Sequence, residues 1–405
     1  MKYLILVGDG MGDYPLEELD NRTPLEAAST PMMDELCRKG EFFLTSTVPE
    51  GYPPGSDVAN MSLMGYDPAA YYTGRAPFEA AAMGITLAED ELAFRCNMVT
   101  LDYEEGGRVK MRDFCAGHIE NSESHELIAA LEAACSSAHF HFKPGVSYRH
   151  LLLYKGERPG FTTVPPHDHI GKDVTAFYNE YFGPENWKAL IEGVGPVLER
   201  HPVNAARLAA GKNPANMIWL WGEGGSIVLP KLHQRFGLSG TMVSAVDLLK
   251  GLGLLAGLNS PDIPGATGYI DTNYAAKAEA ALTALGSEDF VFVHLEGPDE
   301  AGHKGSIEDK LTAIEDFDAK IVRPIIEELR KRGDDFRAVV TMDHFTPIAL
   351  RTHVSDPVPT ILYDSREQSA GSGLSFCEKN CKEYEQKHAG AIGDGHRMIE
   401  KLILR

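Results

Sequence analysis

Acidic and histidine residues follow three short apolar stretches of this chain, and each stretch is typical of a buried strand. Asp9 follows residues 3–7, Asp299 and His303 follow residues 290–295, and Asp343 and His344 follow residues 338–342. Open α/β sheets place their sites just past the carboxyl ends of their strands. Carboxylate oxygens and imidazole nitrogens are ligands for divalent ions such as Mn²⁺ and Zn²⁺. The pattern therefore predicts a two-metal site at one sheet edge, suited to phosphoryl chemistry.

The spacing of these residues sets conditions on their local structure. Asp299 and His303 are four residues apart, so both side chains can point the same way if that turn is helical. The neighbours Asp343 and His344 can serve one metal only on a bent segment. His353 lies ten residues past Asp343, in a loop that can return to the same rim.

Ser56 stands where a helix is expected to begin, directly after the Gly/Pro-rich turn of residues 51–55. A serine hydroxyl is a weak nucleophile unless a metal ion or a base activates it. The N–H groups at a helix start can also hold a phosphoryl group. The alternative for Ser56 is an ordinary helix cap. For Asn60, one turn further on, contact with a phosphoryl oxygen and a plain helix-surface amide remain equally open.

Size and composition indicate a globular enzyme and exclude some partners. The chain has 405 residues, enough for two or three domains of about 100–200 residues each. A net charge of −21 argues against nucleic acid and requires local cations to attract an anionic substrate. No apolar run near the start reaches the ~20 residues that span a bilayer, so no membrane partner is expected. The six cysteines include no Cys-x-x-Cys pair, which favours free thiols in a reducing, cytoplasmic location.

The order of apolar runs predicts an α/β fold with an insertion. Residues 1–75 and 214–405 alternate between strand-like and helix-like stretches, which indicates a mostly parallel sheet with helices on both faces. The run at residues 217–221 is expected to begin the second part of that core. Residues 76–213 carry none of the seven metal-site candidates and are expected to form an inserted α+β cap domain.

Several segments together resemble one protein family. They are residues 7–13 (VGDGMGD), 55–61 (GSDVANM), 73–80 (TGRAPFEA), 94–100 (FRCNMVT), 147–150 (SYRH), 219–222 (WLWG), 293–303 (VHLEGPDEAGH) and 343–344 (DH). The chain resembles the archaeal-type 2,3-bisphosphoglycerate-independent phosphoglycerate mutases of the alkaline phosphatase superfamily. The resemblance runs over nearly the whole chain.

The resemblance implies a role for each candidate residue. It implies that one metal is held by Asp299, His303 and His353, and the other by Asp9, Ser56, Asp343 and His344. Ser56 would take the phosphoryl group from 3-phosphoglycerate and return it to the 2-position. The ions would be Mn²⁺ or Zn²⁺, with Mg²⁺ possible, and no 2,3-bisphosphoglycerate would be needed. The glycerate would be bound by Arg149, His150, Asn204 and Arg207, and Lys231 would stabilise the transferring phosphoryl group. For each basic residue, a surface ion pair is the alternative.

Other functions remain open at this point. A phosphatase or a phosphonate-cleaving hydrolase would need the same metal ligands, and a metal-stabilised binding protein is a different class altogether. The sequence gives no role to His118, His167 or His169 and does not indicate the oligomeric state. Activity is expected to rise with pH, because histidine must be neutral to bind a metal ion.

Overall fold

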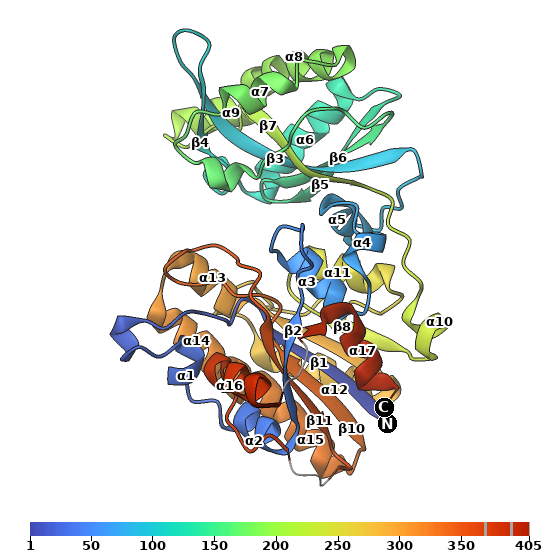
Figure 1. The fold of residues 1–405 in the computed structure, drawn as a ribbon. Helices are drawn as coiled ribbons and strands as arrows, with labels where there is room; N and C mark the ends of the chain where they lie inside the picture. The colour runs from blue at the N-terminus through green and yellow to red at the C-terminus, as the bar shows by residue number, and fades with distance from the viewer. Residues whose placement is uncertain (368–370, 389–391, 405) are drawn as a thin grey trace. The chain divides into compact units, whose positions relative to one another are not determined.

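The computed structural model describes residues 1–367, 371–388 and 392–404, and the chain forms two compact units (Figure 1). The first unit combines Met1–Tyr72 with Val228–Arg405, and the second is Thr73–Ile227. The second unit thus starts close to the boundary expected at 75/76 but ends well past the one expected at 213/214.

The first unit is built on a mixed, mostly parallel seven-stranded sheet, which confirms the expected fold class. Its strands, in spatial order, are β12 (Gly393–Asp394), β2 (Glu41–Ser46), β11 (Val358–Asp364), β10 (Phe336–Thr341), β1 (Lys2–Gly8), β9 (Phe290–Leu295) and β8 (Gly240–Val243). The first strand of the chain, β1, lies in the middle of the sheet and pairs in parallel with both β10 and β9. Only β11 runs antiparallel to its neighbours.

Helices cover both faces of this sheet because its strands are apolar on both sides. Leu4 and Leu6 of β1 join a cluster with residues of α2, α12 and α15, whereas Ile5 and Val7, which alternate with them, are equally buried on the opposite face. There α3 contacts both α11 and α17, and α11 and α17 contact strands of the sheet. The helices of this unit are α1 (Pro24–Ala27), α2 (Pro31–Lys39), α3 (Ser56–Leu63), α4 (Pro68–Tyr71), α10 (Leu232–Phe236), α11 (Asp247–Leu255), α12 (Tyr274–Ser287), α13 (Gly297–Lys304), α14 (Ile307–Asp316), α15 (Arg323–Arg332), α16 (Glu378–His388) and α17 (Gly395–Ile403), with the 3₁₀ turn η1 (Glu17–Leu19) and the π-helical η3 (Phe317–Val322).

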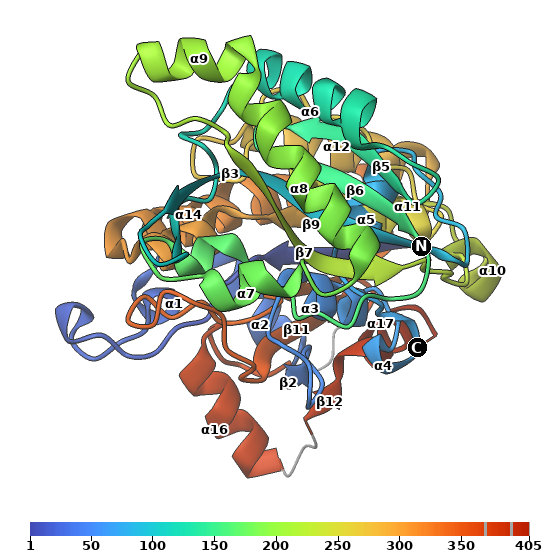
Figure 2. The ribbon, with the colours of Figure 1, turned by 90° about the horizontal axis from the view of Figure 1, so that it is seen from above.

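The second unit has its own antiparallel sheet. Its strands are β3 (Glu91–Tyr103), β4 (Val109–Asp113), β5 (Phe140–Val146), β6 (Arg149–Lys155) and β7 (Met217–Gly225). Its helices are α5 (Ala76–Ala82), α6 (Asn121–Cys135), α7 (Thr175–Glu180), α8 (Glu185–Arg200) and α9 (Pro202–Ala209), with the 3₁₀ turn η2 (Pro166–His169). Helices α6 and α8 pack side by side over the sheet (Figure 2). The strand expected at 217–221 is present as β7, but it pairs with β3 here, so its assignment to the first sheet was wrong.

Two further sequence expectations concern the whole chain. All six cysteines are free thiols, as expected. Across residues 1–367, 371–388 and 392–404, each helix is too short or too polar to cross a bilayer.

Candidate metal centre

The predicted ligands lie at the carboxyl ends of three adjacent strands in the middle of the first sheet. Strands β10, β1 and β9 are neighbours and run in parallel, and they lead directly to Asp343, Asp9 and the helix α13 that carries Asp299. All three carboxylates are buried. Asp343 lies on a bend after β10, as its pairing with His344 on one metal requires. Asp299 and His303 both lie in the helix α13, so their four-residue spacing places them on one side of it.

One group of ligand atoms gathers around Asp299. Its Oδ2 lies 3.3 Å from Nε2 of His303, and its Oδ1 lies 3.2 Å from Nε2 of His353. The Nδ1 atoms of these histidines lie within hydrogen-bond distance of backbone carbonyls, of Arg351 at 3.0 Å and of Pro54 at 3.2 Å. Donation to a carbonyl fixes the ring and leaves Nε2 as the metal-facing atom, which is the usual arrangement for a ligating histidine.

The second group gathers around Nε2 of His344. This nitrogen lies 3.2 Å from Oγ of Ser56, 3.4 Å from Oδ1 of Asp9 and 3.5 Å from Oδ2 of Asp343. The Asn60 amide donates to the same Asp343 oxygen at 2.8 Å and so orients it. The structure therefore brings all seven predicted metal-site residues together in two adjoining groups.

The structure excludes one of the two alternatives for Ser56 and one of the two for Asn60. Ser56 is the first residue of α3, and the cap position belongs to Gly55, so Ser56 is not the helix cap. Asn60 is fully buried, which excludes a helix-surface amide. Its observed partners are Asp343 and the carbonyl of Ser56, so the structure shows a contact to a predicted ligand.

The electrostatics of the site call for added positive charge. Burial and the neighbouring Asp343 and Asp299 carboxylates raise the pKa of Asp9 well above its usual range. Oδ1 of Asp9 is buried and has no hydrogen-bond partner among the described residues. Burial, reinforced by His353 and His303, lowers the pKa of His344 to about 4. Crowded carboxylates beside a neutral imidazole form a donor set that fits divalent cations.

Comparisons with known proteins show which family the chain belongs to. Residues 37–204 match the family described as 2,3-bisphosphoglycerate-independent phosphoglycerate mutase. A Geobacter sulfurreducens protein with that name, marked probable, is 47% identical over 409 residues and covers 100% of both chains. The chain belongs to this mutase family. The Methanosarcina acetivorans member is 50% identical over 94% of this chain and 95% of its own. The solved cofactor-independent phosphoglycerate mutase of Thermoplasma acidophilum has 28% identity and a TM-score of 0.63, covering 100% of this chain and 99% of its own.

Metal binding by this member of the mutase family is expected to tighten with rising pH. Burial alone lowers the pKa of His303, but the Asp299 carboxylate outweighs it and raises the pKa to about 9. At neutral pH an ion must therefore displace a proton from this imidazole, and its affinity increases until pH reaches that pKa. Calorimetric Mn²⁺ titrations in buffers of different ionisation enthalpy will show proton release. Affinity that is independent of pH would contradict the histidine ligands.

Lys231 lies at the opposite edge of the first sheet, which corrects its predicted contact with the transferring phosphoryl group. Its ammonium donates to the carbonyl of Leu255, at the end of α11, at 2.6 Å. The chain then returns to the start of β8, where Asn259 donates to the carbonyl of Gly240 at 2.9 Å. The ligand cluster follows the carboxyl ends of the strands, so Lys231 is on the wrong side of the sheet.

Asn204 and Arg207 serve the interior of the second unit, so their predicted contact with glycerate is also wrong. The Asn204 amide donates to the carbonyls of Leu198 and Ala215 at 2.9 and 2.8 Å. Arg207 is buried and pairs with Glu123 at 2.5 Å. Both side chains are used to hold α9 and the loop after it in place.

The other two residues predicted to contact glycerate differ from each other. Arg149 is exposed, and its guanidinium lies 5.6 Å from the ring centre of Tyr148. His150 is buried, and its Nδ1 accepts a hydrogen bond from the backbone of Gly145 at 3.0 Å. Burial and the nearby His125 lower the pKa of His150 to about 3, so it is neutral at physiological pH. Arg149 remains a candidate for anion binding, and His150 is placed to support β6.

Three buried polar residues beside the ligands were not predicted from the sequence: His294 in β9, Glu296 directly after it and Lys277 in α12. Nε2 of His294 lies 3.4 Å from Oδ2 of Asp9, and Lys277 pairs with Glu296 at 2.5 Å. The available signal was a histidine inside an otherwise apolar strand and a lysine on the apolar side of a helix.

A fourth missed residue, Lys310 of α14, supports the loop behind Asp299. Its fully buried ammonium donates to Oδ2 of Asp13 at 2.8 Å and to the carbonyls of Gly12 and Thr346 at 3.1 and 2.8 Å. The hydroxyl of Thr346 in turn donates to Oδ1 of Asp299 at 2.5 Å. Lys310 therefore fixes two segments that carry or contact metal-site residues.

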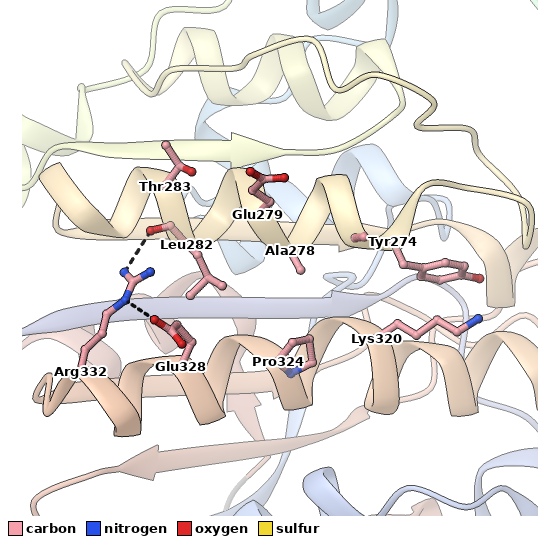
Figure 3. A pocket seen from close by; sticks show the side chains of 10 residues that line it. Tyr274, Ala278, Glu279, Leu282, Thr283, Lys320, Pro324, Glu328 and Arg332 are labelled. Atoms are coloured by element: carbon pink, nitrogen blue, oxygen red, sulfur yellow. Dashed lines mark hydrogen bonds and ion pairs between the residues drawn. The ribbon is translucent and has the colours of Figure 1, made fainter.

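A groove elsewhere on the first unit is not the metal site. It has a volume of about 710 Å³ and lies between α12 and the η3–α15 segment (Figure 3). At one end of the groove, Arg332 donates to Glu328 at 3.1 Å and to the carbonyl of Leu282 at 3.2 Å. None of the predicted metal-site residues lines it.

Proposed function

We propose that this protein interconverts 3-phosphoglycerate and 2-phosphoglycerate through a phosphoserine at Ser56, using two divalent metal ions and no 2,3-bisphosphoglycerate. The observation that carries the proposal is the position of the Ser56 hydroxyl, 3.2 Å from Nε2 of His344 and inside the group of predicted ligands. Membership in the mutase family supports the choice of substrate.

The roles of the chain's residues follow from the two ligand groups. Asp299, His303 and His353 would hold one ion, and Asp9, Ser56, Asp343 and His344 the other, with Mn²⁺ or Zn²⁺ as the expected metals. When bound, such ions lower the pKa of a coordinated hydroxyl and neutralise charge on the transferring phosphoryl group.

The transfer itself balances in two steps. The Ser56 oxygen forms a bond to phosphorus while the bond to the 3-oxygen of glycerate breaks, and the serine proton ends on that oxygen. The 2-hydroxyl oxygen of glycerate then forms a bond to phosphorus while the bond between phosphorus and the Ser56 oxygen breaks. The proton of the 2-hydroxyl ends on Ser56. The helix α3, which begins at Ser56, adds N–H groups that favour the phosphoryl anion.

The proposal assigns retention of the freed glycerate to the second unit. This unit has an array of basic side chains around Trp221, whose ring centre lies 3.9 Å from the guanidinium of Arg95 and 5.9 Å from that of Arg75. Arg95 pairs with the carboxylate of Glu79 at 2.9 Å. Arginine is well suited to bind a carboxylate with two parallel hydrogen bonds. A phosphatase has no need to retain its product, so retention separates the two activities.

A two-product assay tests the proposal. The metal-loaded protein is incubated with 3-phosphoglycerate alone, and 2-phosphoglycerate and free phosphate are measured in the same sample. We expect 2-phosphoglycerate to approach equilibrium with little phosphate released, and a chelator to abolish the reaction until Mn²⁺ is restored. Release of phosphate without 2-phosphoglycerate would favour the hydrolase alternative.

A further inference from the structure

His294 lies next to the carboxylates of Asp9 and Asp343, at a position that none of the predicted ligands occupies. Its ring is fully buried near the end of β9. Nε2 lies 3.4 Å from Oδ2 of Asp9 and 3.8 Å from Oδ2 of Asp343. His344, in the Ser56 group, instead faces the other oxygen of Asp9, Oδ1, at 3.4 Å. Asp9 thus has an imidazole beside each of its oxygens.

The opposite side of the His294 ring faces a fixed carboxylate. Nδ1 lies 3.5 Å from Oε1 of Glu296. That oxygen accepts hydrogen bonds from the hydroxyl of Ser244 at 2.9 Å and from the backbone of Ala245 at 2.8 Å. Oε2 pairs with the Lys277 ammonium at 2.5 Å, so both oxygens are held in place. Because its neighbours are all donors, Glu296 is ionised and can only accept from His294.

This placement leaves one nitrogen of His294 in need of a cation. If Nδ1 carries the ring proton towards Glu296, the lone pair of Nε2 points at two carboxylates, which is repulsive unless a cation lies between them. Neither nitrogen of the buried ring has a hydrogen-bond partner in the described part of the chain. The distance of 3.4 Å to Asp9 exceeds the usual hydrogen-bond range of about 2.7–3.2 Å. It falls within the separation of two neighbouring ligand atoms of one ion, which is about 2.8–3.8 Å when each bond is about 2.0–2.2 Å.

We infer that Nε2 of His294 is a further ligand of the metal ion that Asp9 and Asp343 would hold, and that Glu296 and Lys277 are positioning residues for it. The inference rests on the two-metal site proposed above. In many metal sites the second nitrogen of a ligating histidine faces a carboxylate, which orients the ring and raises its basicity. Glu296 faces Nδ1 of His294 in this way, at an ion-pair distance of 3.5 Å. Lys277 adds a second anchor, since its ammonium also donates to the His294 carbonyl at 3.2 Å.

The rival explanation is a permanently protonated imidazolium that stabilises Asp9 and Asp343 by charge alone. The two explanations predict opposite effects of removing the ring. Loss of a ligand weakens binding of the ion, whereas loss of a competing positive charge leaves binding unchanged or tightens it.

The test measures metal binding rather than catalysis. Mn²⁺ binding to the full-length chain is followed by equilibrium dialysis, and Co²⁺-loaded protein by its visible absorption. We expect wild type to bind two ions, and His294→Ala to bind one of them about 10–100-fold more weakly with a changed cobalt spectrum. His294→Asn should show the same loss, because it can keep a donor towards Glu296 but lacks Nε2. Glu296→Gln should weaken the same ion less.

Controls separate the possible failures. His125→Ala, an exposed histidine of the second unit, should bind both ions as wild type does. Circular dichroism of each metal-free variant checks the fold, and His294→Asn is the variant to use if His294→Ala does not fold. Two ions bound with unchanged or tighter affinity in the His294 variants would overturn the ligand assignment and leave the proposed function standing. A wild-type protein that binds no ion would overturn both.

Discussion

Replacing Ser56 with alanine should lower the rate of phosphoglycerate interconversion at least about 10³-fold while the protein stays folded. The substitution removes the oxygen that would bond to phosphorus. It costs little stability, about 1 kcal/mol at most, because among the described residues the hydroxyl has one hydrogen-bond partner, Nε2 of His344. Initial rates of 2-phosphoglycerate formation and chemical denaturation of both proteins measure the two effects.

Ser62→Ala is the matched control on the same helix. The Ser62 hydroxyl is buried and has no hydrogen-bond partner among the described residues, so its removal should leave the rate near that of wild type. Incubation of wild type with substrate followed by acid quench should also reveal phosphate on Ser56 by mass spectrometry. A Ser56→Ala protein with substantial mutase activity would exclude the phosphoserine route.

Replacing Lys310 with methionine should destabilise the first unit by about 3–5 kcal/mol. Methionine has a similar length, but it leaves the Asp13 carboxylate buried without its ammonium partner and removes the Lys310 donor from the carbonyls of Gly12 and Thr346. Such a loss exceeds the effect of most single substitutions. The free energy of unfolding in urea measures it.

Lys320→Met provides the comparison, because Lys320 is an exposed lysine of η3 paired with Asp316. An exposed pair contributes about 0–1 kcal/mol, so this variant should unfold close to wild type. The double variant Lys310→Met with Asp13→Asn should lose less than the sum of the two single losses, since the unpaired charge is gone. Equal stability of Lys310→Met and Lys320→Met would show that the buried ammonium contributes nothing to the fold.

The ligand-bearing strands could be predicted because both signals, an apolar run and the acidic residue after it, lie within a few residues of each other. The runs that became β1, β9 and β10 are mostly apolar without strict alternation, a pattern that favours a parallel strand buried on both faces. Each is followed at once by an acidic residue or a short acidic helix. Parallel strands end at the same edge of a sheet, so a site there followed from the sequence once the strands were found.

The sheet to which β7 belongs could not be predicted in the same way. An apolar run indicates that a strand is buried, but it does not indicate with which other strand it pairs. The partner of β7 is β3, more than 100 residues earlier in the chain, as in the pair Cys96 and Leu220. Periodicity has no information on that pairing, and the run was therefore assigned to the sheet that follows it in sequence.

The roles of single polar residues were the least predictable part. Lys231 and Arg207 have the charge expected of phosphate or carboxylate ligands, but the structure uses both for internal hydrogen bonds. His294 and Lys277 are also basic residues, and their sequence surroundings are those of an interior strand and helix. The structure nevertheless places them beside the predicted metal ligands. A residue type specifies what a side chain can bind, and only the packing specifies whether its partner is internal.

The central position of the first strand has a consequence for synthesis on the ribosome. β1 leaves the exit tunnel long before both of its neighbours, β9 and β10, which lie in the last third of the given sequence. Every strand of the Thr73–Ile227 unit, by contrast, is complete once residue 227 has emerged. The middle of the polypeptide is therefore expected to fold while the apolar amino-terminal segment still waits for partners, and that nascent segment is the natural client for a chaperone.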